Sequence, residues 1–179
     1  MENRDYLFYE QGVPELQDYL LSNELYWNLT GQDRLTIGGL LLARLKMEHV
    51  IFPGAEWDTI RNLDDQLGEI KEHWMIAWNN KVKREIGSRL RLWSEFLSDY
   101  WSSPDEFADG YTQEVKKRVI LKLLEIEIGG KFPEQEQLAS LDSRLHTKLI
   151  PGRFIWPDDQ VENFNETEYW FLYGSLKTK

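Results

Sequence analysis

One apolar stripe at helical spacing, from Trp57 to Trp101, constrains the fold of this chain more than any other feature. Its thirteen residues are separated by steps of three or four, as one face of an α-helix requires. Five of them are tryptophan, so the stripe carries a large apolar surface that must be buried. We therefore predict an all-α fold, a helical bundle of about five helices with one very long central helix. The stripe consists of Trp57, Ile60, Leu63, Leu67, Ile70, Trp74, Trp78, Val82, Ile86, Leu90, Trp93, Leu97 and Trp101.

The length of this predicted helix is too great for a compact domain. Its twelve steps cover 44 positions, about 3.67 residues per step, which disfavours the period of a left-handed coiled coil. Unbroken, it would be about 68 Å long, whereas a compact chain of 179 residues is about 40 Å across. We expect the helix to break or to project, with Gly68, Asn79–Asn80 and Gly87 as the positions of low helix propensity. The segment 74–78 is apolar all round, so it is predicted to be enclosed on several sides.

Prolines, glycines and capping residues divide the rest of the chain into further helices. A helix that begins with its proline is predicted over 14–22, and a second follows over 33–50 with its first residue as the N-cap. The second contains Gly38–Gly39, which indicates close approach to another helix. Further helices are predicted over 103–128, with a capping box at its start and a glycine pair at its end, and over 134–149.

The two ends of the chain are rich in aromatic residues. We predict a single domain in three parts: an N-terminal arm and short helix over 1–33, a helical core over 34–150, and an aromatic, acidic tail over 151–179 that packs on the core. Three of residues 6–9 are aromatic as well, and this segment could pair with the tail as short strands. An apolar fraction of 41% and an aromatic fraction of 13% exclude a disordered chain.

Composition excludes several classes of function. A net charge of −10 disfavours a nucleic-acid partner, and the absence of cysteine removes disulfides, thiolate metal sites and thiol nucleophiles. Neither a secretory signal nor an apolar stretch of about 20 residues is visible, so we predict a cytoplasmic protein without membrane attachment. Basic residues gather over 81–91 and 116–122. They either balance the acidic ends or form a groove for an anionic ligand.

Two histidines each follow a carboxylate by four residues, as Glu69 with His73 and Asp142 with His146. Such spacing places each pair on one helix face, and surface pairing is the simplest interpretation. The Glu-x-x-His spacing of metal-binding bundles is missing, so we predict no metal and no cofactor. We find no nucleophile motif and no phosphate loop, and therefore no catalytic residue. The candidate ligand-binding residues are Trp74, Trp78, His73 and Glu69.

These observations favour a non-enzymatic helical protein-interaction or assembly protein, which either self-associates or binds a protein partner. Its predicted interaction surface is Trp93, Trp101, Trp156 and Trp170. One alternative is a small-molecule- or metal-binding helical bundle, which could be an enzyme. A second alternative is an acidic nucleic-acid mimic or inhibitor that uses Asp158, Asp159, Glu162, Glu166 and Glu168.

Overall fold

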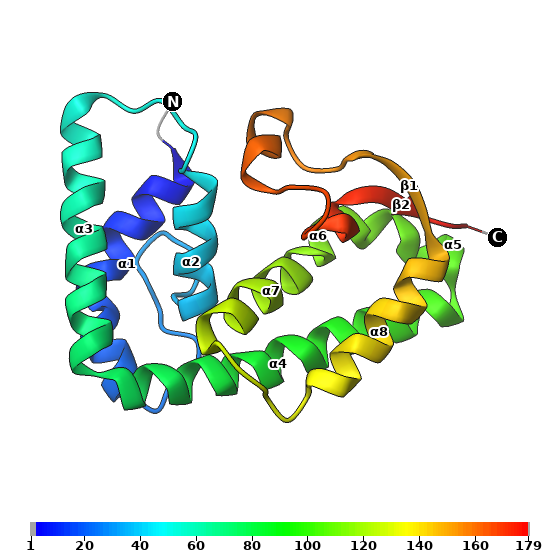
Figure 1. The fold of residues 1–179 in the computed structure, drawn as a ribbon, viewed down its shortest axis with the longest axis horizontal. Helices are drawn as coiled ribbons and strands as arrows, with labels where there is room; N and C mark the ends of the chain where they lie inside the picture. The colour runs from blue at the N-terminus through cyan, green and yellow to red at the C-terminus, as the bar shows by residue number, and fades with distance from the viewer. Residues whose placement is uncertain (1–2, 179) are drawn as a thin grey trace. The chain divides into compact units, whose positions relative to one another are not determined.

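The computed structural model describes residues 3–178 and is 70% helical. Eight α-helices and one two-stranded sheet lie within this range (Figure 1). The predicted all-α fold with a long helix near its middle is confirmed. The elements are α1 (Arg4–Leu21), α2 (Ile37–Lys46), α3 (Gly54–His73), α4 (Met75–Ser102), α5 (Pro104–Phe107), α6 (Tyr111–Glu114), α7 (Lys116–Ile128), α8 (Gln135–Lys148), β1 (Leu149–Phe154) and β2 (Tyr173–Leu176), with short 3-10 helices at Ala108–Gly110, Asp158–Asn163 and Trp170–Leu172.

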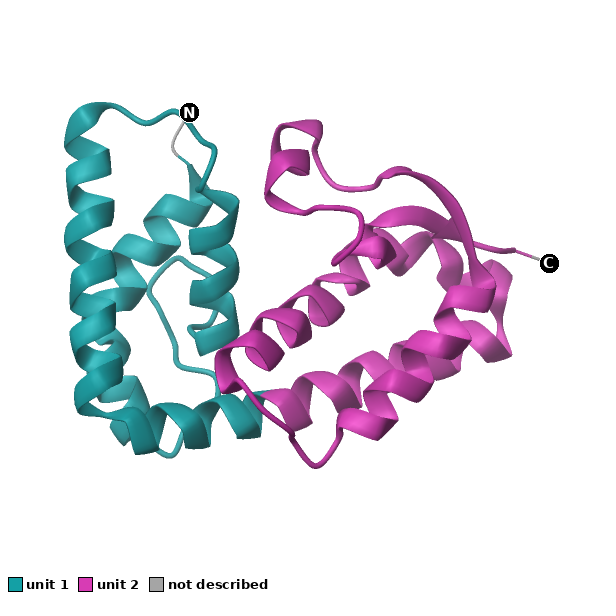
Figure 2. Cartoon of the chain, in the orientation of Figure 1, with its two compact units in different colours: residues 1–85 teal, residues 86–179 magenta. Residues whose placement is uncertain are grey.

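The chain forms two compact units, residues 1–85 and residues 86–179 (Figure 2). Helices α1, α2 and α3 belong to the first unit, and α5 to α8 with the strand pair belong to the second. Helix α4 contributes residues to both units, so the division falls inside a helix and inside the range 34–150.

The helix predicted over the stripe breaks at Trp74, between α3 and α4. Trp74 has φ −112° and ψ 32°, outside the helical region. Its N–H still donates to the Ile70 carbonyl, and its own carbonyl accepts from the Trp78 N–H, both at 2.9 Å. The break therefore costs little backbone hydrogen bonding. The expected break positions, Gly68, Asn79–Asn80 and Gly87, all lie inside helices, so that expectation was wrong.

The stripe stays on the inner side of both helices, and none of its residues is exposed. Packing of this face outweighs the small propensity cost of one glycine within a helix. Met75 and Ile76, in contrast, are 53% and 81% exposed at the corner where α3 meets α4 (Figure 1). The prediction that residues 74–78 are enclosed on several sides is therefore wrong.

In the first unit, α1 packs against both α2 and α3. A Cβ atom on Gly39 would lie 3.3 Å from the Phe8 ring, so the glycine pair allows the close approach of α2 to α1 that the sequence predicted. A polar network joins the three helices, because Asp64 accepts the Tyr9 hydroxyl at 2.7 Å and the Arg44 Nε at 2.9 Å.

Two helix starts differ from the prediction. The side chain of Asn3 accepts from the Tyr6 N–H at 3.0 Å, so α1 begins ten residues before the proline at position 14, which lies inside the helix. The Thr36 hydroxyl accepts from the Gly39 N–H at 2.9 Å, so Thr36 and not Asp33 is the N-cap of α2. Because residues 6–9 are helical, they do not pair with the tail as a strand.

In the second unit, the end of α7 and both ends of α8 agree with the prediction to within one residue, but the helix predicted over 103–128 is divided into α5, a 3-10 helix, α6 and α7. Gly129 ends α7 in the left-handed conformation, with φ 60°. Pro104 occupies the first turn of α5 as expected, although the Ser103 side chain makes no capping hydrogen bond. The strands β1 and β2 are antiparallel, with Leu149 opposite Leu176.

Aromatic side chains hold the tail against the helices of this second unit. The Tyr111 hydroxyl donates to the Phe171 carbonyl at 2.7 Å, and the Tyr100 hydroxyl donates to the Lys177 carbonyl at 2.9 Å. Phe164 and Phe171 are fully buried. The tail thus packs on α4 and α6, and its backbone carbonyls are satisfied by tyrosines of the helices.

Candidate functional site

The four candidate ligand-binding residues lie around the break between α3 and α4. Glu69 and His73 are exposed, Trp74 is half-buried and Trp78 is buried. The structure brings His73 against Trp74, with the ring centroids 4.9 Å apart, but shows no hydrogen bond between His73 and Glu69. None of the four lines either groove described below. No group of three or more possible metal-ligating side chains occurs within residues 3–178.

The second predicted pair, Asp142 with His146, is not formed. Asp142 instead accepts two hydrogen bonds from Arg118, from Nε at 2.9 Å and from Nη2 at 2.7 Å. The His146 ring packs edge-on against Trp170, with 4.9 Å between centroids. A planar guanidinium binds a carboxylate at two points, which an imidazole cannot do. No local pattern in the sequence indicates that α7 and α8 bring Arg118 and Asp142 together.

The four tryptophans predicted as an interaction surface have different environments. Trp93 is fully buried and stacks on Phe96, so it does not contribute to a surface. Trp101, Trp156 and Trp170 are half-buried. The guanidinium carbon of Arg144 lies 3.6 Å from the centre of the Trp101 ring, and the Trp156 indole donates to the Thr112 carbonyl at 2.9 Å. These two contacts, and the packing of His146 on Trp170, tie the three side chains to their own unit.

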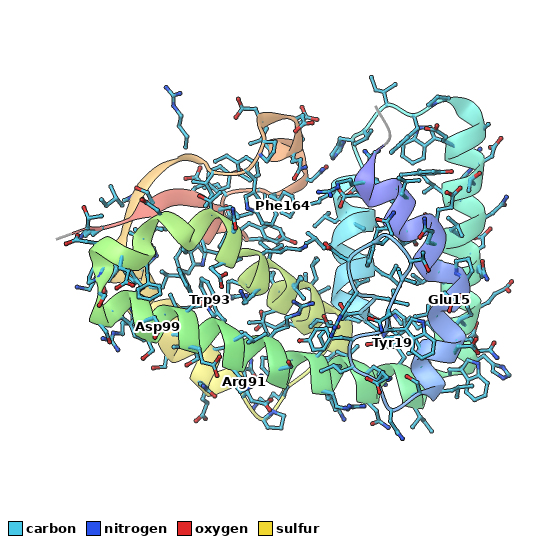
Figure 3. The ribbon with its side chains drawn as sticks, turned by 180° about the vertical axis from the view of Figure 1, so that it is seen from behind. Glu15, Tyr19, Arg91, Trp93, Asp99 and Phe164 are labelled. Atoms are coloured by element: carbon cyan, nitrogen blue, oxygen red, sulfur yellow. The ribbon has the colours of Figure 1, made fainter. Side chains whose placement is uncertain are left out.

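A different feature of the first unit is its long loop between α1 and α2, residues 22–36. A loop of this length without regular structure is uncommon in a compact unit and is often functional. Four successive carbonyls of the loop, at positions 22 to 25, accept hydrogen bonds from side chains. Lys81 Nζ donates to the carbonyl of residue 22 at 3.0 Å and also to that of residue 24, and Arg84 donates to the carbonyl of residue 23 at 3.0 Å. The hydroxyl of Tyr19, which Figure 3 labels, donates to the carbonyl of residue 25 at 3.0 Å. We call these three side chains the loop clamp.

Lys81 is the central residue of the loop clamp. It is only 3% exposed, and its ammonium lies 4.4 Å from the centre of the Tyr19 ring. Burial lowers the pKa of Lys81, and the nearby positive charge of Arg84 lowers it further, whereas Glu24 raises it. Because its donors are bound to carbonyls, Lys81 acts as a structural cation in this arrangement and not as a nucleophile.

One turn further along α4, Glu85 fixes the start of α2. Its carboxylate is fully buried and accepts from the Gly38 N–H at 2.9 Å. This backbone group is one of those left without an intrahelical partner at a helix N-terminus, where the helix dipole also favours a negative charge. Lys81 and Glu85 together explain why α4 must complete the first unit. One holds the start of the loop, and the other holds the helix that follows it.

The fixed loop forms one wall of an open groove of about 800 Å³. Residues of α1 form the other wall. We call it the loop groove, and its lining is Gln11, Pro14, Glu15, Glu24, Tyr26, Trp27, Asn28, Leu29 and Thr30. It contains two carboxylates and two aromatic side chains, but no basic residue. The indole of Trp27 donates to Glu15 at 3.3 Å across the groove, and the Trp27 backbone is bridged to Leu35 in both directions.

A second groove, of about 480 Å³, lies where the end of α1 meets the first turns of α4. It is basic at one side through Lys83 and Arg84, and Lys83 forms no ion pair with any of residues 3–178. Three aliphatic side chains with at least half of their surface exposed lie beside it in the chain. The groove and these side chains together are the junction patch: Leu20, Leu21, Ser22, Met75, Ile76, Ala77, Asn80, Lys81, Lys83 and Arg84.

The structure is thus a helical protein whose first unit has one groove lined by acidic and aromatic residues and one patch of basic and apolar residues. Comparison with protein families, with curated proteins and with solved structures found no match to the chain. Across residues 3–178, the helices are too short or too polar for any of them to traverse a bilayer.

The loop groove was missed by the sequence interpretation, although the sequence contains a signal for it. The adjacent aromatic residues Tyr26 and Trp27 stand in a stretch that shows no helical period. In the sequence, the basic residues at 81 and 84 are part of a charged cluster with no indication of a separate role. Their hydrogen bonds to a loop some sixty positions earlier depend on tertiary structure.

Proposed function

We propose that this protein is a non-enzymatic assembly protein that associates with a second copy of itself. In this proposal, the junction patch of one copy contacts the acidic segment of the tail, Asp158–Glu168, of another copy. The observation that carries the proposal is the exposure of Leu21, Met75 and Ile76, at 53%, 53% and 81%, next in the chain to residues that line one groove. Single exposed aliphatic residues are ordinary, but several beside a concave surface are typical of a protein-binding site.

Charge complementarity supports a second copy as the occupant. The acidic segment contains five acids and no base, and the junction patch presents Lys83 and Arg84. Val161 in the same segment is 39% exposed, so the segment offers an apolar side chain among its acids. Asp158 and Asp159 are exposed and form no ion pair with any of residues 3–178. An apolar centre with charges of opposite sign around it is the usual anatomy of an interface.

Because the two surfaces are different, their contact would be head-to-tail. Such contacts extend into rings or filaments when both surfaces of each copy are occupied. We therefore expect a mass that rises with protein concentration and passes beyond the dimer. The acids that would serve a nucleic-acid mimic are here assigned to contact basic residues of the same protein.

Sedimentation velocity over a range of protein concentrations tests this proposal. We expect Ile76→Asp to weaken association by at least tenfold, because it places a charge at the centre of the interface. Lys83→Glu should weaken it as well, and Lys83→Glu combined with Asp159→Lys should restore part of the loss. Raising the salt concentration to about 0.5 M should weaken the wild-type assembly, since the charges at the rim are screened.

The matched control is Ile51→Asp, which introduces the same charge at a side chain that is 97% exposed outside the junction patch. It should associate as the wild type does. A wild-type protein that remains monomeric at all concentrations would overturn the proposal. So would an assembly that Ile76→Asp and Ile51→Asp affect equally.

A further inference from the structure

The loop groove has a lining that is unlike the junction patch and shares no residue with it. From this lining we infer a second binding site, for an arginine side chain carried by an extended segment of a partner polypeptide. The inference goes beyond the proposed self-association, because it concerns another surface and another ligand. It rests on the charge of the groove, on its aromatic side chains, and on the rigid attachment of its loop.

The loop groove is negatively charged, and no basic side chain among its lining residues balances the carboxylate of Glu15. Its carboxylate accepts from the indole of Trp27 at 3.3 Å, and it forms no ion pair with any of residues 3–178. Glu24, the second carboxylate of the groove lining, is partly balanced by the positive charge of Lys81. A cation that enters the groove would therefore meet one uncompensated carboxylate, at Glu15, whose position is already fixed by a neighbouring side chain.

Aromatic side chains beside that carboxylate favour a guanidinium over a simple ammonium. A guanidinium is planar, binds a carboxylate through two parallel hydrogen bonds, and stacks on aromatic rings. Trp27 and Tyr26 both line the groove, and neither is exposed. Tryptophan is the ring that attracts cations most strongly. An ammonium would gain the charge interaction, but it has no plane to stack and no paired donors.

The size and openness of the groove favour a polypeptide over a free small molecule. A volume of about 800 Å³ is several times that of one guanidinium group and is at the upper end of the usual range for ligand sites. Small molecules are held in sites that surround most of their surface, whereas this groove is a channel between one helix and one loop. A chain segment can follow such a channel and place one side chain beside Glu15.

The loop clamp makes the groove a site that exists before binding. Lys81, Arg84 and Tyr19 hold the carbonyls at positions 22 to 25, and the backbone bridge between Trp27 and Leu35 holds the far side. A loop that is already fixed loses less conformational entropy when a ligand binds. This arrangement also separates roles: the loop clamp positions the wall of the groove, and Glu15, Tyr26 and Trp27 contact the ligand.

Titration calorimetry with two synthetic peptides tests the inference. One peptide is acetyl-Gly-Ser-Arg-Ser-Gly-amide, and the other carries citrulline, which is neutral and nearly isosteric, in place of arginine. We expect the arginine peptide to bind the wild-type protein at least tenfold more tightly than the citrulline peptide. Glu15→Gln should weaken the arginine peptide by at least tenfold. The glutamine can still accept from the Trp27 indole, so the groove should remain folded.

The matched control is Asp18→Asn, which removes an exposed carboxylate from the same helix outside the groove lining. It should bind the arginine peptide within about twofold of the wild type, since exposed charges at a distance are screened. In ¹H–¹⁵N spectra, the indole signal that disappears in Trp27→Phe should be the one that the peptide shifts.

Three results would overturn the inference. The first is no binding of the arginine peptide at millimolar concentration, and the second is equal binding of the arginine and citrulline peptides. The third is a Glu15→Gln variant that binds as the wild type does. Argininamide, a small molecule with the same cation, distinguishes the source of the ligand: it should bind at least tenfold more weakly than the peptide. Equal affinity would overturn the polypeptide as the occupant.

Discussion

Arg118 should be the most costly single charge to remove from the second unit. It is 6% exposed, binds Asp142 through two hydrogen bonds at 2.9 and 2.7 Å, and its guanidinium carbon lies 4.7 Å from the centre of the Phe171 ring. Arg118→Met keeps the length of the side chain but leaves Asp142 without its cation. Breaking a buried pair on one side costs about 3–5 kcal/mol. The Asp142 side chain is 21% exposed and can be partly hydrated, so we expect a loss near the lower limit, about 3 kcal/mol.

The free energy of unfolding in urea, followed by both far-ultraviolet circular dichroism and tryptophan fluorescence, measures this loss. Agreement of the two probes is needed, since two compact units can unfold in two steps. The double variant Arg118→Met, Asp142→Leu should lose less unfolding free energy than the two single variants lose together. We expect the difference to be at least about 1 kcal/mol. Arg91→Met, at an exposed pair with Glu95, should change stability by less than about 0.5 kcal/mol. A loss below about 1 kcal/mol for Arg118→Met, or strict additivity in the cycle, would refute the reasoning.

Three further predictions follow from features of the two units. Lys81→Met should lower the free energy of unfolding by about 2 kcal/mol, because a charged donor to two carbonyls is lost. Amide hydrogen exchange over residues 22–30 should also become faster, and unchanged exchange there would contradict the role of the loop clamp. Burial raises the pKa of the Tyr9 and Tyr111 hydroxyls, so they stay protonated in the folded chain and ionise when it unfolds. The stability that they contribute is complete below about pH 10 and is lost as the pH rises further. Urea midpoints measured against pH should therefore decline above this pH, and a flat profile would disprove the prediction. Gly129→Ala should lower the free energy of unfolding by about 1 kcal/mol, because residue 129 has a positive φ. Gly130→Ala should change the stability little, and similar losses at both positions in thermal or urea unfolding would be inconsistent with a backbone cause.

The fold class could be predicted from the sequence because helical periodicity is a local property. The stripe from Trp57 to Trp101 identified the inner face of two helices correctly along its whole length. The glycine and proline signals placed the end of α7 at Gly129. The position of the break could not be predicted in this way. Trp74 has an ordinary helix propensity, so no local signal distinguishes it from its neighbours in the stripe.

The starts of α1 and α2 were missed for a related reason. Several residues near each start could serve as caps, and the tertiary packing decides which of them is used. Asp33 and Thr36 are both good N-caps, and the structure uses Thr36, whose neighbours Leu35 and Ile37 are fully buried. The proline at position 14 resembled a helix start, although α1 accommodates it on its exposed side.

The binding surfaces were the least predictable part of the molecule. Trp93 belongs to the core, and the carboxylate that precedes His146 is held by Arg118. The loop groove depends on hydrogen bonds between the loop at 22–25 and side chains of α4, and no local pattern specifies such contacts. Periodicity reports which face of a helix is buried. It does not report which loops meet across a surface.

The passage of one helix through both units has a consequence for how the protein is made. The first unit is completed by Lys81 and Glu85, the residues that hold its loop and the start of α2, and both lie in the first turns of α4. During synthesis these turns cannot be stable while the nascent chain ends just after them, because a helix frays over its last turn. The first unit is therefore expected to be completed only after the turn of α4 that follows Glu85, which belongs to the second unit, has also left the ribosome.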